Sequence, residues 1–380
     1  MKIKPKFSFI WIILGLLIRL VLSQIGYNHD VTAYYHVGEI VQDGQVIYAA
    51  TNKFNYGFIM AYVFGACFWL NKTIGCGSIQ GMHALVCLIC AIFDVLIALQ
   101  LNKRFGTKLA FLFLFHPISL LITGYHTQFD TIAIYLGLKC WFCLEDNKPI
   151  KQAILWLAVS LIVKHVFLLF LPWLLFYKKY NLKERIALFA SPLLLFLISF
   201  GPFMIEASAR AGVFAHVFSY NSFEQHSLLG ILCQQIPYFD AINANIFGGK
   251  LLKYIFMLSI AVLGYFSMRK LNSKAIYIYL WALVALSSGM TDQYLAITCV
   301  TTVVFYRKPI LRIFVLIATA YLIFDSRNNL SGSIHSLQYF SNNSVFVATL
   351  LSVATCQLLL FLALFKELTW PSETNHAPPP

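Results

Sequence analysis

The stretch that decides the fold is FSFIWIILGLLIRLVLSQI at residues 7–25, followed directly by Gly26-Tyr27-Asn28-His29-Asp30. The apolar run is long enough to cross a hydrocarbon core of roughly 30 Å as a helix. Lysines at positions 2, 4 and 6 precede it, and the positive-inside rule keeps such a basic end in the cytoplasm. No small-residue cleavage site follows the run, so we expect a retained helix rather than a signal peptide. The first helix therefore runs outward, and Asp30 follows it on the outer face.

The composition extends this interpretation to the whole chain. Of 380 residues, 59% are hydrophobic and 11% are charged, and the mean hydropathy is +0.74. Soluble domains carry about 25% charged residues. Apolar runs of roughly helical-span length follow one another, and the alternating ten-residue strands of outer-membrane barrels are absent. The sequence predicts an all-α polytopic membrane protein.

Basic residues in short loops set the expected topology. The net charge of +13 lies mainly in loops such as 102–108, 178–185 and 307–308. We expect about twelve transmembrane helices, within a range of about 10–14, with both termini cytoplasmic. One membrane domain covers residues 1–365, with outer loops at 26–82, 206–249 and 325–343, and residues 366–380 form a disordered cytoplasmic tail. No basic cluster with interleaved aromatic residues is present, so no nucleic-acid partner is expected.

Two apolar runs depart from simple alternation. Residues 58–70 are short for a span and are expected to lie in the outer interface or to dip into it. Residues 152–177 have basic residues beyond both ends, which favours two short helices with Lys164 and His165 near the outward apex. A single tilted span, which would place Lys178 and Lys179 outside, is the weaker alternative.

Ionisable and amide side chains collect at the outer ends of the predicted helices, whereas the inner loops hold mainly Lys and Arg. The candidate site residues in this outer set are His29, Asp30, Tyr35, His126, Gln128, Asp130, Arg210, Asp292 and Gln293. Ionisable groups at several helix ends on one face predict a convergent site.

Each outer carboxylate has two interpretations. Asp30 is placed to act as a general base at the water–lipid boundary, or it is a solvated residue at a helix end. Asp130 and Asp292 each stand at the start of a predicted helix, where an N-cap role competes with a site role. Arg210 either clamps a phosphate or is a surface residue.

Lys164 needs a partner. A lysine in the middle of an apolar run costs about 2.5–3.5 kcal/mol on insertion scales. A lipid-linked phosphate would compensate this cost, and so would an internal carboxylate such as Asp94. We expect Asp94 itself to be paired within the helix bundle and structural.

Common catalytic and metal motifs are absent. The pairs Cys87/Cys90 and Cys140/Cys143 have metal-like spacing but lie in predicted membrane helices without a second ligand pair. We interpret them as packing residues and expect no metal site from them. There is no Gly-rich phosphate loop, His-Glu-x-x-His pattern or nucleophile elbow.

Short motifs in their order along the chain resemble the multi-spanning glycosyltransferases of the C-type fold (GT-C), which use polyprenyl- or dolichyl-phosphate sugars. Asp30 occupies the position of the acidic residue in the first outer loop that is the hallmark of that superfamily. Residues 115–130 (FHPISLLITGYHTQFD) are similar to its asparagine-proline and histidine-glutamine-aspartate pattern, and residues 164–173 (KHVFLLFLPW) resemble its lysine-bearing segment.

Three further segments match this superfamily less closely. Residues 55–57 (NYG) resemble its aromatic-Pro-Pro segment but lack both prolines, and residues 218–224 (FSYNSFE) are loosely like its aromatic-rich loop. Residues 292–295 (DQYL) stand where many members carry a histidine-bearing motif, and here the histidine is missing.

The resemblance implies transfer of one hexose, mannose or glucose, from the lipid phosphate to an acceptor on the periplasmic or lumenal face, with inversion. The acceptor is a glycan, a lipid or a protein. Asp30 is the implied base, acting directly or by assisting a divalent metal. Lys164, His165 and Arg210 are implied to hold the donor phosphate. The implied substrate-binding residues are His29, Tyr35, His126, Gln128, Asp130, Asp292 and Gln293.

The sequence leaves open a bacterial inner membrane and an endoplasmic reticulum location, and its compact outer loops favour the former. A multi-spanning transporter or lipid flippase is the main alternative function. Transporters place polar groups near the midplane on broken helices in repeated halves, whereas here the polar groups crowd one face. A non-catalytic assembly subunit is the third interpretation.

Overall fold

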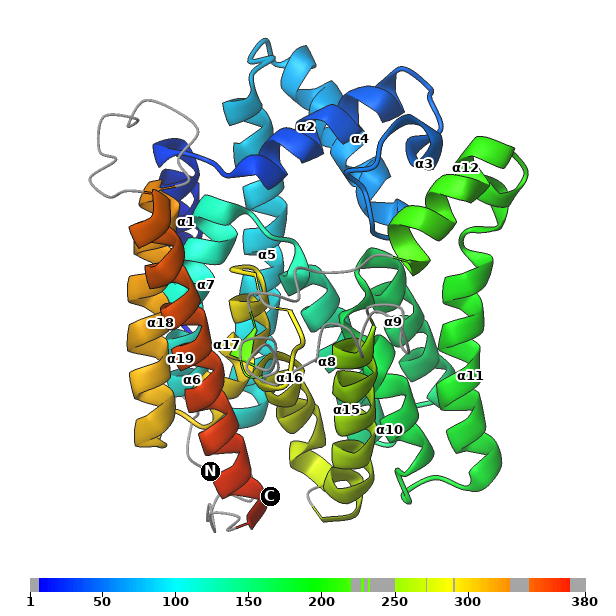
Figure 1. The fold of residues 1–380 in the computed structure, drawn as a ribbon, viewed down its shortest axis with the longest axis vertical. Coiled ribbons are helices and arrows are strands. Elements are labelled where there is room, and N and C mark those ends of the chain that lie inside the picture. Colours follow the sequence, from blue (N-terminus) through cyan, green and yellow to red (C-terminus); the bar gives the residue numbers. More distant parts are fainter. Residues whose placement is uncertain are drawn as a thin grey trace.

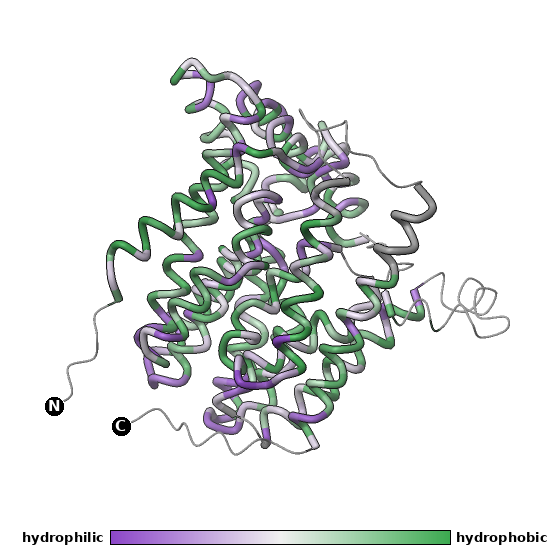
Figure 2. The backbone as a smooth tube through the Cα atoms, turned by 90° about the vertical axis from the view of Figure 1, so that its left-hand side faces the viewer, coloured by the Kyte–Doolittle hydropathy of each residue, from purple (hydrophilic) through white to green (hydrophobic). Residues whose placement is uncertain are grey.

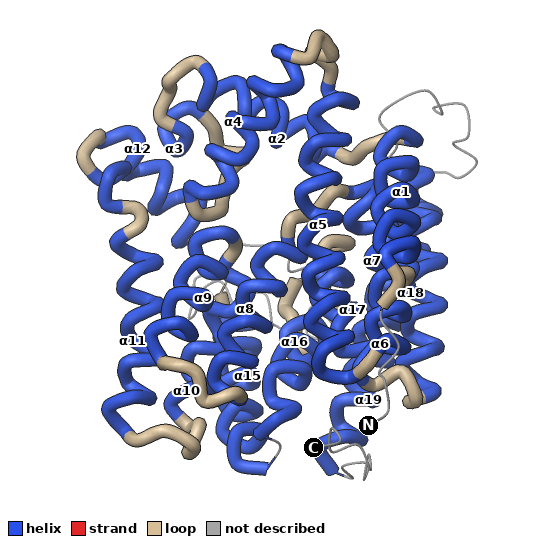
Figure 3. The backbone as a smooth tube through the Cα atoms, turned by 180° about the vertical axis from the view of Figure 1, so that it is seen from behind, coloured by secondary structure: helices blue, strands red, loops and turns tan. Residues whose placement is uncertain are grey.

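The computed structural model describes residues 7–219, 227–228, 232, 250–270, 272–289, 291–328 and 342–369. Every regular element within these ranges is helical and none is a strand (Figure 3), in agreement with the predicted all-α class. The N-terminal half contains α1 (Phe9–Ile25), α2 (His29–Gln42), α3 (Ile47–Ala50), α4 (Phe58–Thr73), α5 (Ile79–Phe105), α6 (Thr107–Leu114), α7 (Pro117–Leu121), η1 (Ile122–His126), α8 (Asp130–Glu145), α9 (Ile150–Val163), η2 (His165–Phe170) and α10 (Leu171–Leu175). The C-terminal half contains α11 (Leu182–Ile198), η3 (Gly201–Met204), α12 (Ala207–Gly212), η4 (Val213–Phe218), α15 (Leu251–Lys270), η6 (Asn272–Lys274), α16 (Ala275–Ala285), α17 (Tyr294–Val304), α18 (Pro309–Asn328) and α19 (Asn342–Thr369).

Three of the described helices are long and apolar enough to cross a membrane. They are α5, residues Leu251–Arg269 of α15 and residues Leu351–Thr369 of α19. A fourth results if α6 and the following segment Pro117–His126 count as one span, bent by 43°. Hydrophobic residues extend along much of the length of the long helices (Figure 2). These lengths and compositions fit a helical membrane protein.

A bend between α6 and α7 interrupts the apolar run over residues 109–123. His116 is extended, with φ −65° and ψ 121°, and Pro117 begins the next helix. Proline lacks a backbone N–H and disfavours a helical conformation in the residue before it. The run is therefore divided into two helices at this proline.

Loops that were expected on the inner face meet at one end of the bundle, which we call the basic end. Arg104 Nη2 lies 2.6 Å from Asp146 Oδ1, and Lys308 Nζ lies 2.5 Å from Glu367 Oε2. The last residues of α19 lie at this end as well (Figure 1). The grouping of these loops follows the pattern of basic residues in the sequence.

The segment between residues 150 and 177 folds back on itself, as expected from its basic flanks. The helix α9 ends at Lys164, which is extended with φ −158° and ψ 131°, and η2 and α10 follow. Lys179, beyond α10, donates from Nζ to the carbonyl oxygens of Leu144 (2.7 Å) and Glu145 (2.8 Å), just before α9. Both ends of the segment therefore lie at the basic end, and Lys164 lies at the break.

At the opposite end of the molecule, α2, α3, α4 and α12 form a separate layer (Figure 1). Much of the loop predicted at 26–82 is thus helical, and the expected interface helix at 58–70 is α4. A Cβ atom on Gly38 would lie 2.7 Å from the carbonyl oxygen of Phe64, so α2 and α4 approach each other closely because residue 38 has no side chain. We call this end the Asp30 end.

The disordered tail predicted from residue 366 is wrong for its first residues, because α19 continues to Thr369. Glu367 in this last turn is fully buried between Lys274 (3.5 Å) and Lys308. Residues 1–6, most of the loop 206–249, residues 329–341 of the loop 325–343 and residues 370–380 lie outside the described residues.

A buried polar cluster joins α1 to α5 and α7. Arg19, in the middle of α1, lies 2.9 Å from Asp94 Oδ2 through Nε and donates from Nη2 to Ser119 Oγ (2.7 Å). Thr123 and Thr131 donate to the same carboxylate. Asp94 is therefore paired within the bundle, as expected, and its partner is Arg19.

Candidate functional site

Asp30 lies in the first turn of α2. Asn28 caps this helix, since its Oδ1 accepts a hydrogen bond from the Asp30 backbone N–H (3.1 Å). The Asn28 Nδ2 donates to Asp30 Oδ2 over 3.4 Å, and the Asp30 residue is half-buried. A carboxylate in the first turn is stabilised by the positive end of the helix macrodipole. Asp30 is thus held by a helix end rather than by the irregular loop that the sequence predicted.

Gln128 reaches Asp30 from the segment between η1 and α8. Its Nε2 donates to Asp30 Oδ2, and its Oε1 accepts from the Tyr34 hydroxyl (3.2 Å). Burial, followed by the nearby Asp30 charge, raises the pKa of Tyr34 well above its usual value. Tyr34 therefore stays protonated and donates to Gln128 Oε1, while the Asp30 carboxylate, which can only accept, sets the amide orientation in which Gln128 Nε2 faces it.

A strained residue directs Gln128 toward Asp30. Thr127 has φ 52° and ψ 51°, a left-handed conformation that is uncommon for a β-branched residue. Its Oγ1 donates to the Thr123 carbonyl over 3.2 Å. Such strain, of order 1–3 kcal/mol, persists where the surrounding structure fixes it and is found at functional sites.

Lys164 forms the second part of the site. Its Nζ lies 2.6 Å from Asp130 Oδ2 and 3.0 Å from Gln293 Oε1. The side chains of Lys164 and Asp130 are 8% and 1% exposed. The expectation that Lys164 has a compensating partner is confirmed, and the protein group that fills this role is Asp130 rather than Asp94.

Aromatic rings enclose the Lys164 ammonium. Its Nζ lies 5.0 Å from the ring centroid of Tyr56 and 5.0 Å from that of Phe129, within the range of cation–π attraction. A Cβ atom on Gly57 would lie 1.8 Å from the carbonyl oxygen of Ile162. Only glycine at position 57 allows the loop with Tyr56 to pass this close to the end of α9.

Three consecutive residues connect the two parts. Gln128 contacts Asp30, Asp130 contacts Lys164, and the Phe129 ring between them packs against Tyr34 with centroids 5.7 Å apart. A half-buried carboxylate and a buried ammonium are therefore held on one short piece of backbone. Together they can accept a proton and stabilise an anion.

Of the other predicted residues, four belong to a first group that contacts the site or stands beside one of its residues in the chain. Gln293 joins the site through Lys164, and His126 lies beside Asn28, with 3.3 Å between His126 Nδ1 and Asn28 Nδ2. Asp292 accepts a hydrogen bond from the Tyr321 hydroxyl of α18. His165 is half-buried at the start of η2.

Three predicted residues are not brought to this site within the described parts of the chain. His29 is exposed. Tyr35 donates to the Gly77 carbonyl (3.0 Å), before α5. Arg210 is exposed and donates to the Met204 carbonyl (3.3 Å). Among the described residues, none of these three side chains is hydrogen-bonded to Asp30 or Lys164.

The sequence analysis assigned no site role to Asn28, Tyr34, Tyr56 or Phe129, nor to Ser326, whose Oγ lies 2.9 Å from His126 Nε2. Tyr34 follows Asp30 by four residues, so a helical interpretation of residues 29–42 would have placed both on one face. Asn28 is a preferred N-cap residue type immediately before that helix. Ser326 lies far away in the sequence, and no spacing rule connects it to Asp30.

No metal site is apparent within the described ranges, where no three His, Cys, Asp or Glu side chains gather as ligands. Cys87, Cys90, Cys140 and Cys143 are free and buried, which fits their interpretation as packing residues.

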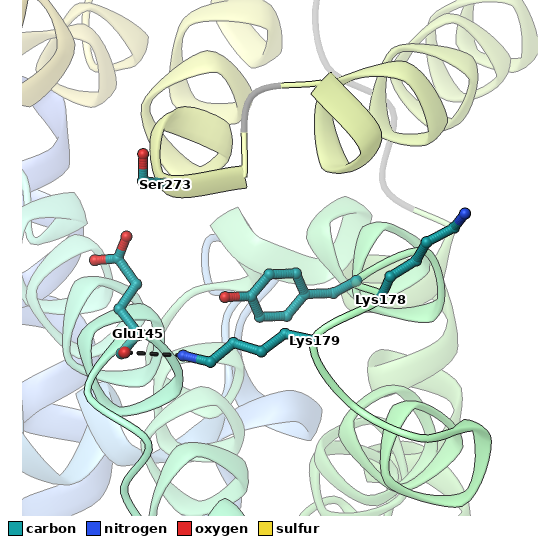
Figure 4. A pocket seen from close by; sticks show the side chains of 5 residues that line it. Glu145, Lys178, Lys179 and Ser273 are labelled. Carbon is teal, nitrogen blue, oxygen red and sulfur yellow. Dashed lines mark hydrogen bonds between the residues drawn. The ribbon is translucent and has the colours of Figure 1, made fainter.

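A separate cleft lies at the basic end. It has a volume of about 480 Å³ and is lined by Glu145, Tyr177, Lys178, Lys179 and Ser273 (Figure 4). Glu145 ends the helix that Asp130 begins, and at 1.5 Å per residue these two positions are about 22 Å apart. This cleft is therefore distinct from the region of Asp30 and Lys164.

Comparison with known proteins gives no match: no family model fits the chain, and neither a curated protein nor a solved structure is significantly similar to it.

Proposed function

We propose that this chain is an integral-membrane glycosyltransferase that transfers a single hexose from a polyprenyl-phosphate sugar to an acceptor, with inversion. The observation that carries the proposal is the link between Asp30 and Lys164 through Gln128, Phe129 and Asp130. It holds a base and a cation near one another at the end of the molecule opposite the basic loops. Glycosyl transfer from a phosphate needs these two functions.

The Asp30 carboxylate is the base. It takes the proton of the acceptor hydroxyl as that oxygen attacks the anomeric carbon from the face opposite the phosphate. The new C–O bond forms while the bond from the anomeric carbon to the phosphate oxygen breaks, and the electron pair stays on the phosphate. One displacement inverts the anomeric centre, and no covalent enzyme intermediate is needed.

The cation stabilises the leaving group. Lys164 has its ammonium among Asp130, Gln293 and two aromatic rings, in surroundings of low dielectric where a charge acts strongly on a developing anion. Lys164 and the adjacent His165 face the donor phosphate in this proposal. Asp130 holds the ammonium in place until the donor arrives.

The fold assigned by this proposal is that of the C-type glycosyltransferases. About twelve membrane-embedded segments follow from it, consistent with the positive-inside pattern. These segments are α1, α5, α6 with α7, α8, α9, η2 with α10, α11, α15, α16, α17, α18 and α19. The layer of α2, α3, α4 and α12 then lies at the periplasmic or lumenal surface, and both termini are cytoplasmic. A bacterial inner membrane is the preferred location and the endoplasmic reticulum the alternative.

A transporter or lipid flippase is the second candidate, and one observation favours it. The segment from α9 to α10 is broken at Lys164, and the segment from α6 to α7 is bent by 43°. Transporters place charged binding groups at such discontinuous helices.

The discriminating experiment uses the purified chain in liposomes with a panel of radiolabelled polyprenyl-phosphate hexoses and a membrane lipid extract as acceptor. Label that moves from the donor to a new product supports the transferase. Label that crosses the bilayer on an unchanged donor supports transport. If no donor gives a new product and no label crosses the bilayer, both proposals are contradicted.

A further inference from the structure

His126 is a buried residue between the start of α2 and α18. Its Nε2 lies 2.9 Å from Ser326 Oγ, and its Nδ1 lies 3.3 Å from Asn28 Nδ2. The residue is 2% exposed. Asn28 in turn donates to Asp30, so a hydrogen-bonded chain leads from α18 to the proposed base.

The orientation of the Asn28 amide follows from its contacts. The backbone N–H of Asp30 can only donate, and it lies 3.1 Å from Asn28 Oδ1. The amide nitrogen Nδ2 therefore faces both His126 and Asp30 Oδ2. An amide nitrogen is a donor only.

This orientation assigns the tautomer of His126. Because Asn28 Nδ2 donates to it, Nδ1 must carry a lone pair and no proton. The ring proton of the neutral imidazole then lies on Nε2 and points to Ser326 Oγ. The assignment comes from the hydrogen-bond network, in which the backbone donor of Asp30 is the fixed reference.

We infer that His126 is a positioning residue for Asp30, acting through Asn28 and not through substrate. Its Nδ1 lone pair accepts one N–H of the Asn28 amide and directs the second toward Asp30 Oδ2. This inference rests on the proposed role of Asp30 as base. It replaces the substrate-binding role that the resemblance implies for His126.

The arrangement also distinguishes the two oxygens of the base. Asn28 and Gln128 both donate to Oδ2 of Asp30. Among the hydrogen bonds of the described residues, the side-chain donors to Asp30 therefore both bond to Oδ2. Oδ1 of Asp30 is then the atom that takes the proton of the acceptor hydroxyl. The amide of Asn28 fixes the orientation of the carboxylate and so the direction in which Oδ1 faces.

Two variants separate positioning from simple packing. In His126→Asn the side-chain oxygen occupies the place of Nδ1 and keeps an acceptor for Asn28. In His126→Gln the amide group occupies the place of Nε2, so the contact with Ser326 is kept and the acceptor for Asn28 is lost. Both variants remove the imidazole and are matched in polarity.

The expected result is that His126→Asn retains kcat within a few fold, whereas His126→Gln loses roughly 10- to 100-fold, a loss of the size seen when the hydrogen-bond partner that orients a metal-binding side chain is removed. The KM values for donor and acceptor stay unchanged in both. Equal kcat in the two variants, or an effect confined to KM, overturns the inference. Melting temperatures of both variants in detergent show whether each is folded.

A second measurement does not depend on activity, so it separates failure of this inference from failure of the proposed function. Nitrogen-15 NMR of histidine-labelled protein in nanodiscs, with His126→Asn used to assign the signal, reports the protonation of each ring nitrogen. A neutral ring protonated on Nε2 at neutral pH supports the inference, even if no transfer is found. A proton on Nδ1 contradicts it, even if transfer is found.

Discussion

Lys164 and Asp130 form an almost fully buried ion pair, with 2.6 Å between Lys164 Nζ and Asp130 Oδ2. The pair lies at the point where α9 ends and α8 begins, and Asp130 is two residues after Gln128, which contacts Asp30. The same pair thus compensates a buried charge and connects the proposed phosphate site to the proposed base.

Removing one member of this pair should be costly. Lys164→Met leaves the Asp130 carboxylate buried without its cation, and we expect a loss of about 3–5 kcal/mol in the free energy of unfolding. The double variant Lys164→Met/Asp130→Leu should recover most of this loss while staying inactive, because the cation is still missing. Thermal unfolding in detergent measures the stability, and a double variant as unstable as the single one would show that the pair is not the cause.

The Arg19–Asp94 cluster gives a second stability prediction. Arg19 is fully buried and bonded to Asp94 (2.9 Å), so Arg19→Met should cost about 3–5 kcal/mol. Glu39→Gln is the control, because Glu39 is 43% exposed and its partner His36 is 53% exposed, and exposed pairs contribute about 0–1 kcal/mol. Similar losses of unfolding free energy in the two variants would contradict the claim that burial makes the Arg19–Asp94 pair the more important one for stability.

Gly57 is predicted to position Tyr56 beside Lys164. A Cβ at position 57 meets the Ile162 carbonyl oxygen at 1.8 Å, whereas a Cβ at Gly201 meets nothing within 4 Å. Gly57→Ala should therefore displace the loop and lower transfer at least about tenfold, since a misplacement of 1 Å can cost a hundredfold. Gly201→Ala should leave transfer unchanged, and initial rates with saturating donor compare the two. Full activity of Gly57→Ala would show that the loop tolerates this shift.

The sequence was sufficient to place Asp30, Gln128, Asp130, Lys164 and Gln293 on one side of the molecule, because basic loops mark the other side and these residues follow apolar runs. It did not give their pairing. Lys164 and Asp130 are 34 positions apart, and only the packing of α8 against α9 determines that they meet.

Two other features were missed for reasons that lie in the residues. The segment HDVTAYYHVGEIVQ, which is α2, is polar and contains Gly38 and β-branched residues, so its helical tendency is weak. Its close packing on α4 overrides this tendency. Arg19 stands in the apolar run 7–25 as conspicuously as Lys164 does in its own, and the same cost of burying a charge would have predicted its partner.

The most direct test of the central claim compares wild type, Asp30→Asn and Asp43→Asn for transfer of labelled hexose from a polyprenyl phosphate. Asp43 is an exposed residue at the other end of α2, so its variant controls for loss of one negative charge. The account predicts that Asp30→Asn loses at least about 100-fold in rate, the lower scale for a general base, with donor binding and melting temperature retained, whereas Asp43→Asn is unchanged. Turnover by Asp30→Asn at the wild-type rate would contradict the assignment of Asp30 as the base.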